Sequence, residues 1–267
     1  MHKRAFLGCA LLLVLSLVTA CGGKSDETAI PPAPGGGAAA TGPTFDMSKA
    51  NATVSGKISF EGTPPPNDKV QMSSDPYCQM HAADYPTVET YKVSSGGLEN
   101  VIVFVSKGLP AGQAYAMPTD PVEINQENCH YTPHVFTMRT NQPLKVKNSD
   151  MTLHNIHAWA EKNPQFNVGQ PVKGMVNETK FAQPEIPLPI KCDVHKWMGA
   201  FIAVVDNPFA TISAEDGKYE LKLPAGKFQI TAIHEKYGMQ TMMVEVKDGD
   251  KTPMNFTFKA SDAKTGD

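Results

Sequence analysis

The sequence lacks several features that mark common classes of protein. It has no cluster of Lys and Arg, and its 24 basic and 27 acidic residues give a formal net charge of −3. A mildly acidic chain of this kind has no electrostatic footprint for nucleic acid, so we expect no nucleic-acid partner. After the N-terminal region no apolar run approaches the length of a membrane span. No stretch shows a helical hydrophobic period of useful length, which argues against a helical fold.

The N-terminus carries a short apolar run instead of a structural element. Lys3 and Arg4 precede an apolar stretch over residues 5–18, and small residues follow directly before Cys21. A basic start, a short apolar core and a small-residue cleavage site are typical of a secretory signal peptide. We therefore expect residues 1–20 to be removed on export.

The position of Cys21 resembles the lipobox of bacterial lipoproteins, in which this cysteine receives lipid and becomes the mature N-terminus. The alternative is an ordinary signal peptide with a chance cysteine. The resemblance implies a protein anchored by its lipid on the periplasmic side of the bacterial envelope. Gly22, in place of Asp after the cysteine, favours the outer membrane by analogy with enteric bacteria.

The segment after the cysteine, within residues 21–50, is rich in Gly, Ala, Pro and Ser. This composition cannot bury a core and predicts a flexible tether. From Thr53 onward the signals are those of β-structure, with short apolar runs separated by Gly, Pro, Asn and Asp. Such a pattern predicts an all-β fold of sandwiches or barrels. The expected strands include residues 54–60, 101–105, 135–138, 144–146, 201–205 and 227–233.

The β-region divides into sections of different character. Residues 97–206 contain the His and Cys residues discussed below. Residues 207–260 contain two alternating strands joined by Pro224-Ala225-Gly226, which predicts a β-hairpin-like unit. This section resembles a carboxypeptidase regulatory-like (transthyretin-like) domain, and residues 52–58 resemble the opening strand of that domain. We therefore expect a β extension over residues 51–96, of which 51–72 is a candidate to complete the C-terminal sandwich, and a tail over residues 261–267.

One constellation of residues suits a metal. Cys192, His195 and Met198 form a C-x2-H-x2-M motif, and His154 stands upstream of it. A thiolate is a soft ligand, imidazole is intermediate, and a thioether is weak and binds at long range. Two His and one Cys in a plane, with a distant axial Met, make the blue-copper arrangement, so the residue types predict one mononuclear copper ion.

These segments resemble the cupredoxins, the type I copper proteins, with a ligand loop similar to that of amicyanin and plastocyanin. The family pattern is found here as Asn148, Asp150, His154 and Asn155, followed by the C-x2-H-x2-M loop and a final strand. The resemblance implies a Greek-key β-sandwich. It also implies that Asn155 hydrogen-bonds across to the ligand loop, although a plain turn asparagine is the alternative. One departure is Lys191, where the family usually has an aromatic residue before the cysteine.

Trp197 lies between two expected ligands. In cupredoxins the edge of the second histidine emerges through an apolar surface, so Trp197 is a candidate for a docking patch. A Trp packed against the neighbouring β-domain is an equal alternative. Met239, Met242 and Met243 suggest either a copper-handling patch or, as we favour, a strand core.

The remaining cysteines have two interpretations. If Cys21 is lipidated and Cys192 binds metal, Cys78 and Cys129 are left to form a disulfide in an oxidising compartment. The rival is a second metal site assembled from these cysteines and the nearby His81, His130 and His134. We favour the disulfide.

The resemblance implies a carrier of single electrons between periplasmic redox proteins. The alternative is a copper protein for storage, delivery or sensing, without a dedicated redox partner. We do not expect an enzyme: the chain has no His-x-His pair, Asp193 rather than His follows Cys192, and the ligand loop has a single cysteine.

Overall fold

The structure is a computed structural model that describes residues 42–263. The predicted signal peptide, Cys21 and residues 22–41 of the predicted tether lie outside the described residues, as do residues 264–267. Residues 42–50 differ from the prediction of a flexible tether, because Phe45 and Ala50 pack in an apolar core. The fold is all-β, as predicted, and every run expected to form a strand overlaps one, with only Val101 of the run 101–105 lying outside its strand. The helical elements described are short: η1 (Met47–Lys49), α1 (Pro76–Met80) and η2 (Ala260–Asp262). None of the described helices is long and apolar enough to cross a membrane.

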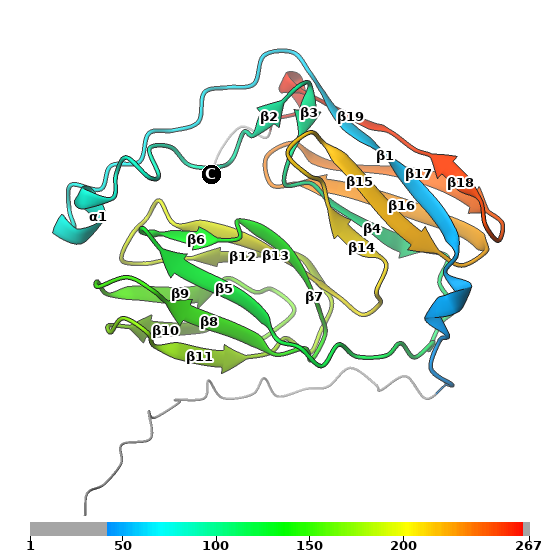
Figure 1. The fold of residues 1–267 in the computed structure, drawn as a ribbon, viewed down its shortest axis with the longest axis horizontal. Coiled ribbons are helices and arrows are strands. Elements are labelled where there is room, and N and C mark those ends of the chain that lie inside the picture. The colour runs from blue at the N-terminus through cyan, green and yellow to red at the C-terminus, as the bar shows by residue number, and fades with distance from the viewer. Residues whose placement is uncertain (1–41, 264–267) are drawn as a thin grey trace, which may run out of the picture.

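A first sandwich, here called the terminal sandwich, is built from both ends of the described chain (Figure 1). One sheet has the order β15-β1-β3-β2, with β18 and β19 also paired to β1; the other has the order β14-β4-β16-β17. Its strands are β1 (Ala52–Glu61), β2 (Val93–Ser94), β3 (Gly97–Leu98), β4 (Ile102–Lys107), β14 (Ala210–Ile212), β15 (Lys218–Leu223), β16 (Gly226–His234), β17 (Gly238–Val246), β18 (Lys251–Pro253) and β19 (Phe256–Lys259).

The predicted hairpin of β15 and β16 is wrong. β15 pairs with β1, while β16 pairs with β4 and β17, so the turn at residues 224–225 carries the chain from one sheet to the other. Leu223 and Phe228 lie on either side of this turn and both pack in the core between the sheets. The alternation of apolar and polar residues identified both strands correctly, but such a pattern does not reveal which strand each of them pairs with.

The second sandwich, called the central sandwich, lies in sequence between β4 and β14. Its sheets have the orders β10-β9-β12-β13-β7 and β11-β8-β5-β6, and they enclose a separate core. Residues 97–107 differ from the prediction, because β3 and β4 belong to the terminal sandwich. The strands are β5 (Val122–Glu127), β6 (His130–Thr132), β7 (Val135–Arg139), β8 (Leu144–Asn148), β9 (His154–Ala158), β10 (Phe166–Gln170), β11 (Val176–Thr179), β12 (Glu185–Lys191) and β13 (Gly199–Val205).

The two sandwiches contact each other through a small apolar cluster and an ion pair. Ile102 of β4 packs with Val135 of β7 and Ala203 of β13. Beside them, His134 Nε2 lies 2.7 Å from Glu235 Oε1, and both side chains are nine-tenths buried. The interface therefore joins the sheets β4-β16 and β7-β13 at a dry contact.

Residues 62–92 belong to neither sandwich and are here called the lid. The lid leaves the end of β1, carries α1 over one end of the central sandwich, and returns to β2 (Figure 1). Cys78 of α1 is joined to Cys129, between β5 and β6, by the predicted disulfide, with 5.6 Å between the Cα atoms. The lid therefore ties a segment near the start of the chain to the loops at that end of the central sandwich.

Candidate metal centre

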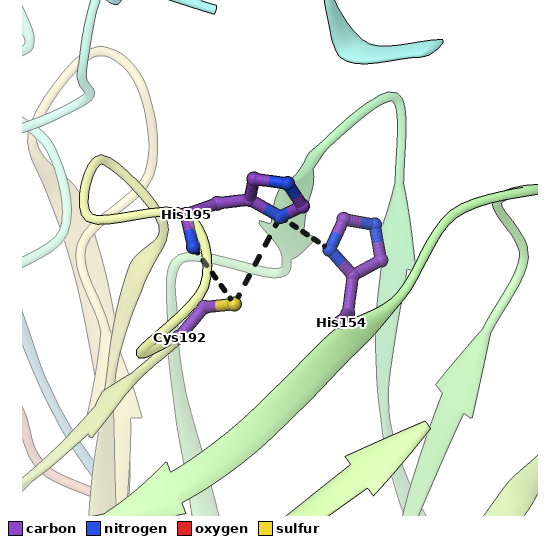
Figure 2. A group of neighbouring side chains, drawn as sticks. All are labelled: His154, Cys192 and His195. Carbon is purple, nitrogen blue, oxygen red and sulfur yellow. Dashed lines mark hydrogen bonds between the residues drawn. The ribbon is translucent and has the colours of Figure 1, made fainter. Parts of the chain in front are cut away.

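Three predicted ligands meet under the lid. His154 is the first residue of β9, Cys192 directly follows β12, and the loop 192–198 carries His195 before β13 begins. Figure 2 shows the two imidazole rings and the sulfur facing one another. The Nδ1 atoms of His154 and His195 are 2.9 Å apart, and Cys192 Sγ lies 4.0 Å from His195 Nδ1. The donors of His154, Cys192 and His195 all lie within 4.8 Å of one another, and the three residues are buried.

The sulfur of Cys192 is held by the backbone and by Asn155. The amide of His195 donates to Sγ at 3.3 Å, and Asn155 Oδ1 lies 3.3 Å from the same sulfur. Asn155 Oδ1 also accepts hydrogen bonds from the amides of Asp193 at 2.7 Å and Val194 at 3.3 Å. Asn155 therefore spans from β9 to the ligand loop, which is the contact that the sequence resemblance implied and not that of a plain turn residue.

The surroundings of Cys192 favour its thiolate. Burial opposes ionisation, but hydrogen bonds from His154, from His195 and from backbone groups outweigh it and lower the pKa of Cys192 from 9.0 to about 6. A thiol with this pKa is largely ionised at neutral pH, and the thiolate is the form that binds metals.

Each histidine has a carboxylate on its outer nitrogen. Asp150 Oδ2 lies 2.8 Å from His154 Nε2, and Asp75 Oδ2 lies 3.2 Å from His195 Nε2. A ring that donates its Nε2–H to a carboxylate keeps the lone pair on Nδ1, so both rings present a ligand atom to the same point.

Asp150 is the centre of a buried hydrogen-bond network. Its oxygens accept from the amides of Asn128 and Cys129, each at 2.8 Å, and from the hydroxyl of Tyr77 at 3.2 Å. Burial favours the neutral acid, but the hydrogen bonds from His154 and from these amides lower the pKa of Asp150. Burial also opposes the charge of His154, and the hydrogen bond to Asp150 outweighs it and raises the pKa of His154. Asp150 is thus held as a carboxylate that accepts from His154 Nε2.

Met198 and Trp197 occupy different surroundings. Met198 is buried in the core of the central sandwich, and its amide donates to the carbonyl of His195 at 2.9 Å. Trp197 is half-buried, and its Nε1 donates to the carbonyl of Cys129 at 2.9 Å. Its ring lies 5.0 Å from that of His195 and packs against the lid. The exposed docking patch expected at Trp197 is therefore wrong, because the lid covers this face. The alternative also differs, since Trp197 packs against the lid and Cys129 and not against the neighbouring β-domain.

Asp75 is the functional residue that the sequence analysis missed. It caps α1, accepting from the amides of Tyr77 at 2.8 Å and Cys78 at 3.1 Å. Asp followed by Pro76 is a signal for a helix start, and it would have predicted the cap. Nothing local to Asp75 connects it to His195, which lies more than a hundred residues later; only the fold brings the two together.

The histidines proposed for a rival site at the disulfide are engaged elsewhere. His81 pairs with Asp84, His130 stacks on Tyr85, and His134 pairs with Glu235. The methionines of β17 also differ from the favoured prediction: Met239 and Met243 are exposed by 65% and 68%, so they do not form a strand core. Met239 and Met243 lie on the face of β17 opposite to Val244 and Val246, whose side chains pack in the core, so the two methionines point away from it.

The donor set fits copper. Two further groups of candidate ligands flank the site, Asp75-Cys78-His195 and Cys129-Asp150-His154, but in each the cysteine sulfur is already bonded in the disulfide. The group of His154, Cys192 and His195 is left with a free thiol among the described residues. One soft thiolate and two imidazoles select copper over hard cations such as Mg²⁺ or Ca²⁺.

No protein-family model and no curated protein matches this chain. Solved copper proteins are similar to parts of it. A copper-containing nitrite reductase from Thermus scotoductus is 16% identical over 38% of this chain, with a TM-score of 0.31, and only 26% of the reductase is covered. A purple cupredoxin from Nitrosopumilus maritimus is 20% identical over 31% of this chain and 98% of its own, with a TM-score of 0.28. Amicyanin from Paracoccus versutus is 18% identical over 38% and 96% of the two chains, with a TM-score of 0.29.

Proposed function

We propose that this protein is a type I copper protein that transfers single electrons. The observation that carries the proposal is the convergence of two Nδ1 atoms and one ionisable sulfur in a site closed to water. His154, Cys192 and His195 are exposed by no more than 2%. When bound there, copper supplies a one-electron couple between its two oxidation states.

The chain's own residues prepare this site. Cys192 provides the thiolate, and Asn155 holds the loop that carries it against β9. Asp150 and Asp75 orient the two rings so that Nδ1 faces the ion. Met198, buried on the same loop, would serve as the weak axial ligand. A donor set fixed in advance by hydrogen bonds needs little rearrangement between oxidation states, which fast electron transfer requires.

We place the protein on the periplasmic side of the envelope, anchored by lipid on Cys21 in the outer membrane, with a periplasmic redox protein as partner. The leader sequence supports export. The Cys78–Cys129 disulfide is also in keeping with an oxidising compartment. The carrier role involves no substrate turnover, so we propose no enzymatic activity.

One observation favours the second candidate, copper storage or delivery. His195 is 1% exposed, and the lid covers the ring edge from which electrons would leave. A carrier should exchange electrons with a small redox protein such as a cytochrome within seconds, whereas a storage protein should hold its copper and exchange electrons slowly.

The test is a copper titration of the full-length lipoprotein in detergent. One equivalent of Cu²⁺ should produce a strong thiolate-to-copper charge-transfer band in the visible spectrum. Cys192→Ser should lose this band, because a hydroxyl does not replace a soft thiolate. Lys196→Ala, on the exposed side of the same loop, is the matched control and should keep it. Absence of the band both in the native protein and in protein whose Cys78–Cys129 disulfide has been reduced, or its persistence in Cys192→Ser, would refute the proposal.

A further inference from the structure

The candidate ligands are sealed from solvent by more than their own sandwich. Exposed fractions are 0% for His154, 2% for Cys192, and 1% for both His195 and Met198. An ion with its hydration shell cannot pass through such packing, so metal entry and metal release both need an element that moves. The question is which element covers the site and what holds it in place.

The lid is that element. Its residue Asp75 reaches His195 Nε2 at 3.2 Å and accepts from the hydroxyl of Thr152 at 2.6 Å, while Tyr77 donates to Asp150. Within the described chain no ladder of strands joins the lid to the central sandwich; it has only a single internal bridge between Lys69 and Thr87. A segment held by a few side-chain contacts opens at lower free energy than a strand in a sheet.

A covalent bond supplements these contacts at the metal centre itself. Cys78 Sγ lies 3.7 Å from His195 Nε2, and the amide of Cys129 donates to Asp150, which holds His154. The disulfide thus touches the surroundings of both histidines. Its two cysteines are fully buried, so small thiols in solution have no direct access to it while the lid is closed.

We propose that the Cys78–Cys129 disulfide is a latch: copper enters while the two thiols are free, and oxidation then closes the lid and traps the ion. On closure Sγ of Cys78 bonds to Sγ of Cys129, and the two thiols lose two protons and two electrons. A protein disulfide of the oxidising compartment takes up both protons and both electrons and becomes a dithiol. This inference rests on the proposed copper function and adds an order to its assembly.

The latch should have a large kinetic effect. The two cysteines are 51 residues apart, and on the chain-entropy model a cross-link of that length changes the opening equilibrium by up to about a thousandfold. Because other contacts hold the lid in part, we expect an acceleration of at least about tenfold when the cross-link is removed.

The experiment compares three full-length proteins. Native protein, Cys78→Ser/Cys129→Ser and Met80→Ser are loaded with copper, and a strong Cu(I) chelator is added with ascorbate. The double variant should take up and release copper at least about tenfold faster than native protein. Met80→Ser changes an exposed residue of the same helix, α1, and should behave as native protein. Equal rates in the native protein and the double variant would overturn the latch.

Two measurements keep the result interpretable. If the double variant lacks the native circular dichroism, native protein reduced with a phosphine takes its place, and reoxidation must restore slow exchange. Hydrogen exchange of the amides of residues 77–80 in metal-free protein should be faster without the disulfide, which tests the lid without any copper. If no protein gives a coloured copper site, the proposed function fails, while hydrogen exchange still decides whether the disulfide holds the lid.

Discussion

The two sandwiches bury different kinds of side chain. The core of the terminal sandwich consists mainly of aliphatic and aromatic residues, among them Val54, Ile58, Phe228 and Phe258. Its buried polar side chains among the described residues are few and include Ser213, Thr231 and His234. The central sandwich buries many polar groups in addition to its apolar core. Those under its metal-binding end are Gln126, Asn148, Asp150, His154, Asn155, Gln170, Asn177 and His195.

The polar groups form a chain of hydrogen bonds that ends at a ligand. Gln170 donates to Asn177 Oδ1 at 2.8 Å and contacts Gln126, and Asn148 donates to the carbonyl of Gln170 at 2.8 Å. Asn148 then accepts from the amide of Asp150 at 2.9 Å. Buried polar groups cost stability unless each finds a partner, so their concentration here indicates that the network fixes the loop before His154. The terminal sandwich has no such task and is packed for stability.

The largest effect should come from the terminal core. Phe256→Ala removes a ring that is 1% exposed and packs near Tyr219, and we expect a loss of about 3–5 kcal/mol of unfolding free energy. The copper spectrum of the folded variant should be unchanged. Urea unfolding followed by circular dichroism, together with the visible spectrum, checks both. A weakened copper band in folded Phe256→Ala would contradict the claim that the terminal sandwich contributes stability without shaping the copper site.

Disruption of the polar network should cost less stability than the loss of Phe256 but should weaken copper binding. Asn148→Leu leaves the amide of Asp150 and the carbonyl of Thr152 without their partner, at a cost of about 1–3 kcal/mol. Copper affinity should fall by about 10–100-fold, because the loop before His154 loses its support. Competition with a chelator measures the affinity. The matched control is Thr231→Val in the terminal sandwich, where a buried hydroxyl bonds to Ser106; unchanged affinity in Asn148→Leu would contradict the network's role.

The interface between the sandwiches should respond to pH. Burial opposes the charge of His134, but the hydrogen bond to Glu235 outweighs it and raises the pKa of His134 above 6.5. A raised pKa in the folded state means that the contribution to stability is fully present below about pH 6.5 and is lost as pH rises through the folded pKa. Glu235→Gln should remove this loss. Melting temperatures between pH 6 and 9 compare the two proteins, and parallel profiles would show that the pair does not couple to folding.

The smallest effect on stability concerns the methionines. Met198→Leu should cost less than about 1.5 kcal/mol, since the volumes are similar, and should leave copper bound. The reduction potential should rise, because the thioether no longer donates to Cu(II). Met243→Leu, an exposed residue of β17, is the control and should change neither quantity. A redox titration that gives equal potentials for native protein and Met198→Leu would remove Met198 from the axial position.

The sequence predicted what is local and could not predict what is distant. Cys192 and His195 stand three residues apart, whereas His154 was joined to them by residue type and by the resemblance to the cupredoxin ligand pattern, with no local signal for β9. The pairing of Cys78 with Cys129 followed from the small number of cysteines. The cover over the site was not predicted, because Asp75 reaches His195 from a lid that, among the described residues, has only the short helix α1 and pairs with no strand of the central sandwich. The strands that pair with β4 and β15 were not predicted either, because the alternation of apolar and polar residues along one strand carries no information on its neighbour.

The most direct test of this account is a crystal structure of the copper-loaded protein with anomalous scattering measured at the copper edge. We predict one peak, bonded to Cys192 Sγ and to the Nδ1 atoms of His154 and His195, under a closed lid. A peak on the Nε2 side of either ring, with Asp75 or Asp150 as a ligand, would contradict it.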